Sequence, residues 1–201
     1  MPKIVDHDAR RREIAATVAR LIAEQMLENV TIQGIARACG YSPGMVLHYY
    51  ANKEQLLLSA LGWCESQHRA RIEKQVAGRR GVQALYHRLL AALPTDATIA
   101  REWHISMQFW SHLPGSPAIA EYYNNRHWES FSAGIEDLEL GTALNELQTG
   151  LDLEWTMRSL TTLVTGIGVS ALYNAGQYPA ATQRRMLKQA IEPLARVALE
   201  D

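Results

Sequence analysis

The chain has 201 residues, of which 47% are hydrophobic and 20% charged, and its net charge is −1. This composition is typical of a globular protein with one or two domains, and the charge argues against a wholly basic nucleic-acid coat protein. Since we find neither a run of eighteen uncharged apolar residues nor a signal-peptide segment, we predict no membrane-spanning helix.

The cysteines and the charge distribution add two expectations. Cys39 and Cys64 lack metal-ligand spacing and are too few for a disulfide framework, so we expect a reducing cytoplasm, with Cys39 as a small buried side chain. Residues 1–53 carry seven Lys and Arg against five Asp and Glu, whereas the remainder carries thirteen against sixteen. The run Arg10–Arg12 fits a polyanion contact or, equally well, a solvated helix face.

Helical periodicity dominates the N-terminal part of the chain. Apolar residues recur at spacings of three and four before Thr31, whose side chain is a candidate N-cap. Gly40 is suited to end the next helix, and Ser42 with Pro43 to begin another. The helices expected in this part, including the long one that Asn52 would cap, span 8–28, 32–39, 43–50 and 53–76.

Two short helices separated by a tight glycine turn and braced by a longer helix predict a helix-turn-helix. Its second helix would leave His48 and Tyr49 facing outward, ready for the major groove of DNA. The residues expected to form its small core are Ile32, Ile35, Ala36, Val46 and Tyr50.

The remaining chain is also predicted to be helical, so the expected fold class is all-α. Pro193 should kink or split the final helix, because proline lacks an N–H group and its ring meets the preceding turn. We expect a loop or short helix at 139–152 and helices at 82–93, 97–113, 117–138, 152–174 and from 180 onward. The predicted domains are residues 1–52, for DNA binding, and the larger part 53–201, for ligand sensing and dimerisation.

At the helix-turn-helix the sequence resembles the TetR family. The resemblance is specific over Arg11–Leu61, and the stretch Thr31–Leu58 follows the family's DNA-binding motif almost throughout. The BetI-type branch is indicated by Ser42-x-Gly44, by the triplet His48-Tyr49-Tyr50 and by Lys53-Glu54-x-Leu56. One departure is Leu47, where many members carry a phosphate-binding tyrosine; leucine is suited instead to a thymine methyl group.

The resemblance implies a DNA surface and a mechanism. Thr31, Tyr49 and Lys53 would hold phosphates, while Gln33 and His48 would contribute most to base specificity. The full predicted DNA-binding set is Thr31, Gln33, Ser42, Gly44, Leu47, His48, Tyr49 and Lys53. The implied function is a one-component regulator, usually a repressor in this family, that leaves a palindromic operator when a small molecule binds.

Aromatic residues at helical spacing in the second domain indicate either ordinary core packing or a small-molecule pocket. Glu102, Glu121 and Glu136 lie nearby in the sequence, and a carboxylate beside aromatic faces suits an aromatic or cationic effector. A histidine on an apolar stripe, such as His68, is more often a core residue than a ligand-binding one. The candidate ligand-binding residues are His68, Trp103, Met107, Trp110, Tyr123, His127 and Phe131.

The helix at 152–174 carries two apolar stripes, and a second stripe is typical of packing across a two-fold axis. Both stripes could instead be buried within one chain. Two helices from each subunit would form a four-helix bundle. The predicted dimer-interface residues are Trp155, Ser159, Thr162, Gly166, Val169, Tyr173, Met186, Ala190 and Leu194.

Signs of catalysis are weak. His104 and His112 are too far apart on one helix to share a metal, and no phosphate-binding glycine loop follows a strand. We therefore expect no catalytic residue, metal or cofactor. The alternative function is a helical small-molecule carrier or adaptor without DNA binding.

Overall fold

The structure, a computed structural model, describes residues 6–200, except for the side chain of His127. Within that range it contains nine α-helices and three short 3-10 helices, and the only extended pairing is one isolated bridge between Leu147 and Ala195. The all-α class predicted from the sequence is confirmed. No helix among residues 6–200 is long and apolar enough to span a membrane.

The chain forms two compact units, each made of two segments. Unit 1 comprises Met1–Gln67 and His104–Gly115, and unit 2 comprises His68–Trp103 and Ser116–Asp201. The chain passes from one unit to the other inside α4 (Lys53–Val76), after Gln67, and inside α6 (Ala97–Trp110), after Trp103, so both helices contribute to both units. The spatial division therefore differs from the predicted one at residues 52 and 53; the assignment of separate functions to 1–52 and 53–201 stays a prediction.

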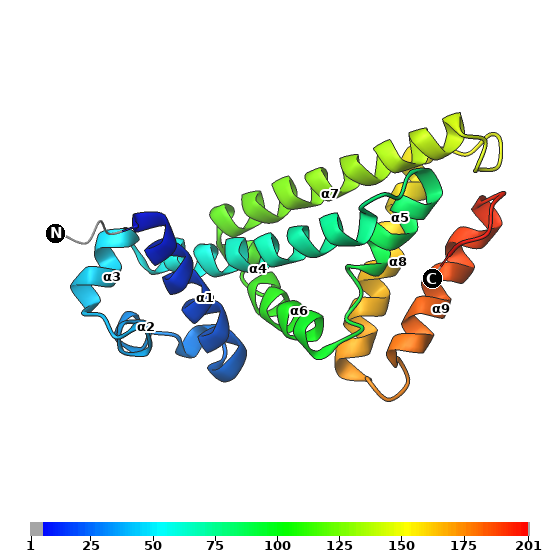
Figure 1. Ribbon diagram of the computed structural model, residues 1–201. Helices are drawn as coiled ribbons and strands as arrows, with labels where there is room; N and C mark the ends of the chain where they lie inside the picture. The colour runs from blue at the N-terminus through cyan, green and yellow to red at the C-terminus, as the bar shows by residue number, and fades with distance from the viewer. Residues whose placement is uncertain (1–5, 201) are drawn as a thin grey trace. The chain divides into compact units, whose positions relative to one another are not determined.

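Unit 1 contains the predicted helix-turn-helix (Figure 1), formed by α1 (His7–Gln25), α2 (Ile32–Cys39) and α3 (Pro43–Tyr49). The predicted caps are present. The hydroxyl of Thr31 accepts from the Gly34 N–H at 3.0 Å and that of Ser42 from the Met45 N–H at 3.2 Å, while Gly40 ends α2 in the left-handed region with φ 70°. These caps set where the two short helices begin and end.

The first helix ends three residues before its predicted end. Met26 has φ 70°, and the chain continues as a 3-10 turn, Leu27–Asn29. Gln108 of α6 satisfies the backbone at this break, because its side-chain oxygen accepts from the Leu27 N–H at 2.6 Å and its amide donates to the Ile22 carbonyl at 3.2 Å. A distant side chain therefore terminates α1, which local periodicity could not indicate.

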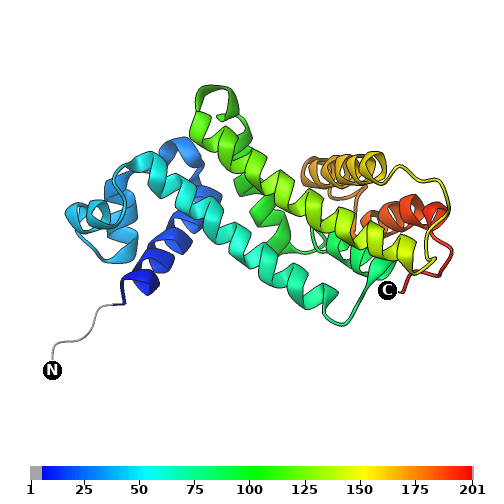
Figure 2. The same ribbon diagram turned by 90° about the horizontal axis from the view of Figure 1, so that it is seen from above.

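Unit 2 is built around four helices that pack side by side. In Figures 1 and 2, α5 (Gly81–Leu90) lies against α7 (Pro117–Ala143) and α9 (Ala180–Ile191), and α8 (Leu153–Tyr173) also contacts α7 and α9. Their apolar faces share one core. Its largest fully buried members are Tyr86, Leu85, Leu93, Leu138, Met157, Ile167 and Leu187.

Two boundaries in unit 2 test the sequence analysis. The helix expected to end at Leu138 continues to Ala143, so the loop expected at 139–152 is shorter than predicted. Gly141 lies inside the longer helix, where it packs closely against α5. A Cβ added at this position would come within 3.1 Å of the Val82 side chain, so the glycine allows this close packing. The predicted effect of Pro193 is confirmed, since α9 ends at Ile191 and a 3-10 turn, Glu192–Leu194, follows.

Candidate DNA interface and effector site

The helix α3 has one buried and one exposed face. Val46 is fully buried against unit 1, whereas Gly44, Leu47 and His48 are exposed. The exposed face also includes Met45, which the sequence analysis did not place on this surface, although its position in the helical turn beside Gly44 could have indicated its exposure. An exposed helix carrying two large apolar side chains and an imidazole has the chemistry required to contact base edges and thymine methyl groups.

The neighbouring polar residues are placed on the surface of the same unit. Thr31, Gln33 and Ser42 are exposed, and Lys53 is half-buried at the start of α4. Asn52 caps that helix, because its side-chain oxygen accepts from the Gln55 N–H at 2.8 Å.

Tyr49 does not face outward as predicted. Its side chain is only 5% exposed, because the first turns of α1 cover it: the His7 ring lies 5.7 Å from its centroid and the Arg11 guanidinium 5.9 Å. The predicted core position of Tyr50 is confirmed, and its hydroxyl donates to the Arg11 carbonyl at 2.9 Å. A phosphate contact by Tyr49 stays a prediction.

Arg11 was not assigned a role of its own by the sequence analysis. Its exposed guanidinium lies over the rings of both Tyr49 and Tyr50, so α1 presents a positive charge beside the end of α3. Arg10, next to it, is held by Glu13 and Tyr41. The arginine run therefore contains one internally paired residue and one cation stacked on the end of the exposed helix.

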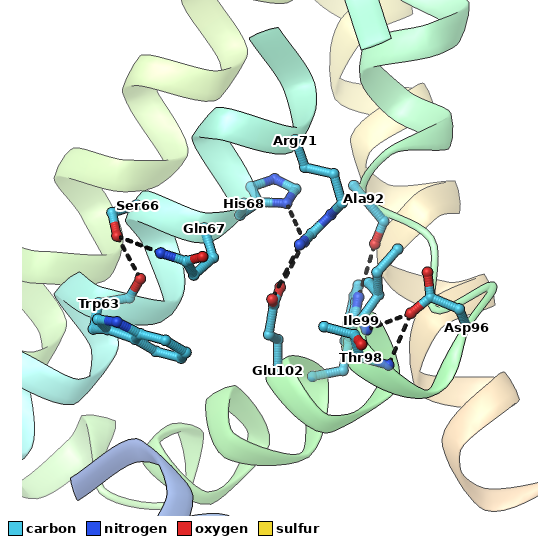
Figure 3. A network of polar contacts seen from close by, with 11 residues as sticks. Trp63, Ser66, Gln67, His68, Arg71, Ala92, Asp96, Thr98, Ile99 and Glu102 are labelled. Carbon is cyan, nitrogen blue, oxygen red and sulfur yellow. Dashed lines mark hydrogen bonds and ion pairs between the residues drawn. The ribbon is translucent and has the colours of Figure 1, made fainter. Parts of the chain in front are cut away.

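A polar cluster, which we call the Arg71 cluster, lies in unit 2 (Figure 3). Arg71 of α4 donates through both terminal nitrogens to Glu102 of α6, at 3.0 and 2.5 Å, and one of these nitrogens lies 3.3 Å from Nδ1 of His68. Both charged side chains are largely buried. Glu102, one of the three carboxylates considered for a cationic effector, is therefore already paired with an arginine.

The electrostatic environment of His68 reflects this cluster. Burial, together with the positive charges of Arg71 and Arg126, lowers the pKa of His68 from 6.5 to about 4. The imidazole is therefore neutral at physiological pH, and Nδ1 is the nitrogen that accepts from Arg71.

The other predicted ligand-binding residues do not form one cluster within a single unit. Trp103, Tyr123 and Phe131 belong to unit 2, whereas Met107 and Trp110 belong to unit 1; the side chain of His127 lies outside the described residues. Trp103 donates to the Ala92 carbonyl at 2.8 Å, and Phe131 is a buried core residue stacked with Trp128. Packing explains the positions of these two aromatic rings, and their contact with a ligand stays a prediction.

The predicted interface residues of α8 are exposed, with Val169 half-buried. Trp155 and Tyr173, at opposite ends of the helix, are 69% and 74% exposed, and a Cβ added at Gly166 between them would meet no atom within 4 Å. The other apolar stripe of α8 is buried except for the half-buried Leu153, and its buried residues are Met157, Leu160, Val164, Ile167 and Ala171. The two stripes are therefore not both covered within one chain. The predicted interface residues beyond α8 differ, because Met186 and Ala190 of α9 and Leu194 of the following 3-10 turn are half-buried against the core of their own unit.

Comparison with known proteins agrees with this architecture. Residues 81–196, more than half of the chain, match the family of BetI-type transcriptional repressors, C-terminal, and residues 14–60 match the bacterial regulatory proteins of the tetR family. The chain is 24% identical over 196 residues to the HTH-type transcriptional regulator PksA of Bacillus subtilis, covering 96% of this chain and 94% of that protein. It is 26% identical over 177 residues to the regulator BetI of Burkholderia lata, covering 80% and 87%.

Solved structures share the fold. A putative transcriptional regulator from Saccharomonospora viridis, in complex with choline, has a TM-score of 0.84 and 24% identity, covering 94% of this chain and all of that one. A putative TetR-family regulator from a Rhodococcus species has a TM-score of 0.81 and 20% identity, covering 92% and 98%. The chain belongs to the TetR family of DNA-binding transcriptional regulators, with a C-terminal region of the BetI type.

Proposed function

We propose that this regulator is a cytoplasmic homodimeric repressor that binds a near-palindromic operator through α3 and is released when a small molecule binds unit 2. The observation that carries the proposal is the capped helix α3, whose exposed face presents Leu47 and His48. Membership of the family favours this function over a carrier or adaptor without DNA binding.

The polar surface of unit 1 supports separate contacts to DNA phosphates and to base edges. Lys53, Thr31 and the exposed Arg11 suit phosphates, whereas Gln33 and His48 suit base edges. The hydroxyl of Thr31 accepts from the backbone through its oxygen and keeps its proton for a phosphate oxygen.

Two features of unit 2 support an effector site. Its polar groups converge in the Arg71 cluster, and a structural relative of the same fold was solved in complex with choline. The helix α4 is continuous from Lys53, at the DNA-binding unit, to Val76, in the unit that carries the cluster. An effector that prefers one arrangement of α4 would shift the population by its difference in affinity for the two arrangements.

The exposed stripe of α8 supports the dimer. Two large aromatic side chains flank the small residues Ser159, Thr162 and Gly166, which allows two helices to approach closely at the centre and to bury large area at the ends. A two-fold axis through this stripe would give each operator half-site one α3 helix.

A mobility-shift titration with DNA from upstream of the gene tests the proposal. We expect the upstream palindrome to be bound at least a hundredfold more tightly than random duplex at physiological salt, because specific binders typically exceed that ratio. Equal affinity for the two duplexes would contradict the proposal.

A further inference from the structure

A second arginine lies near the Arg71 cluster, on the side of His68. Two arginines approach His68, Arg71 from α4 and Arg126 from α7. Of the two carboxylates that pair with them, Glu102 is largely buried, whereas Glu129 is exposed and is shared between Arg126, at 2.6 Å, and Arg69, at 3.1 Å. Two arginines therefore lie near a neutral imidazole, and the buried carboxylate of Glu102 is already paired with one of them.

The Arg71 cluster offers more hydrogen-bond donors than acceptors. Both oxygens of Glu102 are taken by the terminal nitrogens of Arg71, while Nε of Arg71 is buried without a hydrogen-bond partner among the described residues. Because Nδ1 of His68 faces Arg71, the imidazole proton is on Nε2, which is a donor. Buried donors lacking an acceptor are costly, and an acceptor supplied by a ligand removes that cost.

We propose that the effector of this regulator carries an anionic group, such as a carboxylate, which binds beside His68 between Arg71 and Arg126. This inference rests on the proposed function, and it replaces the cationic alternative of the aromatic or cationic effector expected from the sequence. A quaternary ammonium would approach two arginines while the buried carboxylate of Glu102 is already paired with Arg71, and it offers no acceptor to Nε of Arg71.

The lowered pKa of His68 supports the same ligand charge. The surrounding positive potential that disfavours a proton on the imidazole favours a negative ligand at the same place. Binding of an anion would raise the pKa of His68 above 4, so the affinity for the anion should increase as the pH falls from the pKa of the complex toward 4.

Three aromatic probes of similar size and different charge test the inference: benzoate, benzyl alcohol and benzyltrimethylammonium, each titrated into the full-length protein at one ionic strength. We expect benzoate to raise the Tm with increasing concentration and to change the tryptophan fluorescence, since Trp103 directly follows Glu102. Absence of a benzoate effect, or an equal or larger effect of benzyltrimethylammonium, would overturn the inference.

Two substitutions locate the site. Arg126, whose side chain is 17% exposed, and Arg69, which is 57% exposed, pair with the same oxygen of Glu129, so Arg69→Gln is a matched control for Arg126→Gln. We expect Arg126→Gln to weaken benzoate binding at least tenfold and Arg69→Gln to leave it within twofold. Equal affinity in the two variants would place the anion elsewhere.

A third variant guards against simple loss of folding. Glu102→Gln removes the carboxylate that competes for Arg71, so it should tighten benzoate binding severalfold, whereas weaker binding in this variant would contradict the proposed site. Operator binding is measured on the same samples. A protein that binds its operator but not benzoate refutes the anionic effector alone, and one that binds benzoate but no operator refutes the proposed function alone.

Discussion

Lys53 and His48 are expected to contact different parts of DNA, and single substitutions separate their effects. Lys53→Ala should weaken all duplexes alike and reduce the slope of log K against log salt by about 1 per half-site, because one phosphate contact is lost. Lys74→Ala removes the same charge from the last turn of α4, in unit 2, and should leave the slope unchanged. A sequence-dependent loss in Lys53→Ala would mean that this lysine contacts bases.

His48→Ala should relax the base preference at one position per half-site by about 1–3 kcal/mol, because its imidazole lies on the exposed face of α3. Competition between operators that differ at single base pairs measures the change. If the discrimination at every position were unchanged, His48 would not take part in base recognition.

His68 makes the stability of unit 2 depend on pH. Its pKa in the folded chain is about 4, below the ordinary 6.5, because of burial and of the charges of Arg71 and Arg126 that face it. The unfolded chain therefore binds a proton that the folded chain does not, and stability is lost as the pH falls from 6.5 to 4, by at most about 1.4 kcal/mol per pH unit. His68→Gln should flatten this part of a urea-denaturation series; an unchanged slope would contradict the assignment.

At the scale of elements, the contact between α6 and α8 depends on a glycine. A Cβ added at Gly168 would lie 2.4 Å from the Trp103 ring, which is itself fixed by its hydrogen bond to Ala92. Gly168→Ala should therefore destabilise the protein by about 1–3 kcal/mol. Gly62→Ala in the open middle of α4 should instead stabilise it by about 0.5–1 kcal/mol. Urea denaturation of both variants measures the difference, and equal stabilisation would show that the Trp103 ring moves freely.

The element boundaries reveal what the sequence could predict. Caps act within a few residues, so Thr31, Ser42 and Gly40 correctly placed α2 and α3. The end of α1 depends on Gln108, which is more than eighty residues away, and the continuation of α7 depends on the packing of Gly141 against α5. The burial of Tyr49 under α1 and the pairing of Arg71 with Glu102 likewise arise only from tertiary contacts.

For the whole molecule, the exposed stripe of α8 predicts the oligomeric state. Gly166→Glu should yield monomers with unchanged helical content and much weaker operator binding, because a monomer offers only one half-site contact. The same substitution at the exposed Gly62 of α4 is the matched control and should leave the dimer intact. Sedimentation or size-exclusion measurements report the state, and a Gly166→Glu variant that remains dimeric would place the interface on another face.

The central claim is that a two-fold dimer reads DNA through two α3 helices. Selection of bound sequences from a random duplex library tests it most directly, because the operator need not be known in advance. We expect enrichment of an inverted repeat whose half-sites lie about one helical turn, or a multiple of it, apart. If the His48→Ala variant loses its base preference at one position of each half-site, α3 is the helix that contacts the repeat. Enrichment of no sequence, or of a single unrepeated site, would contradict the account.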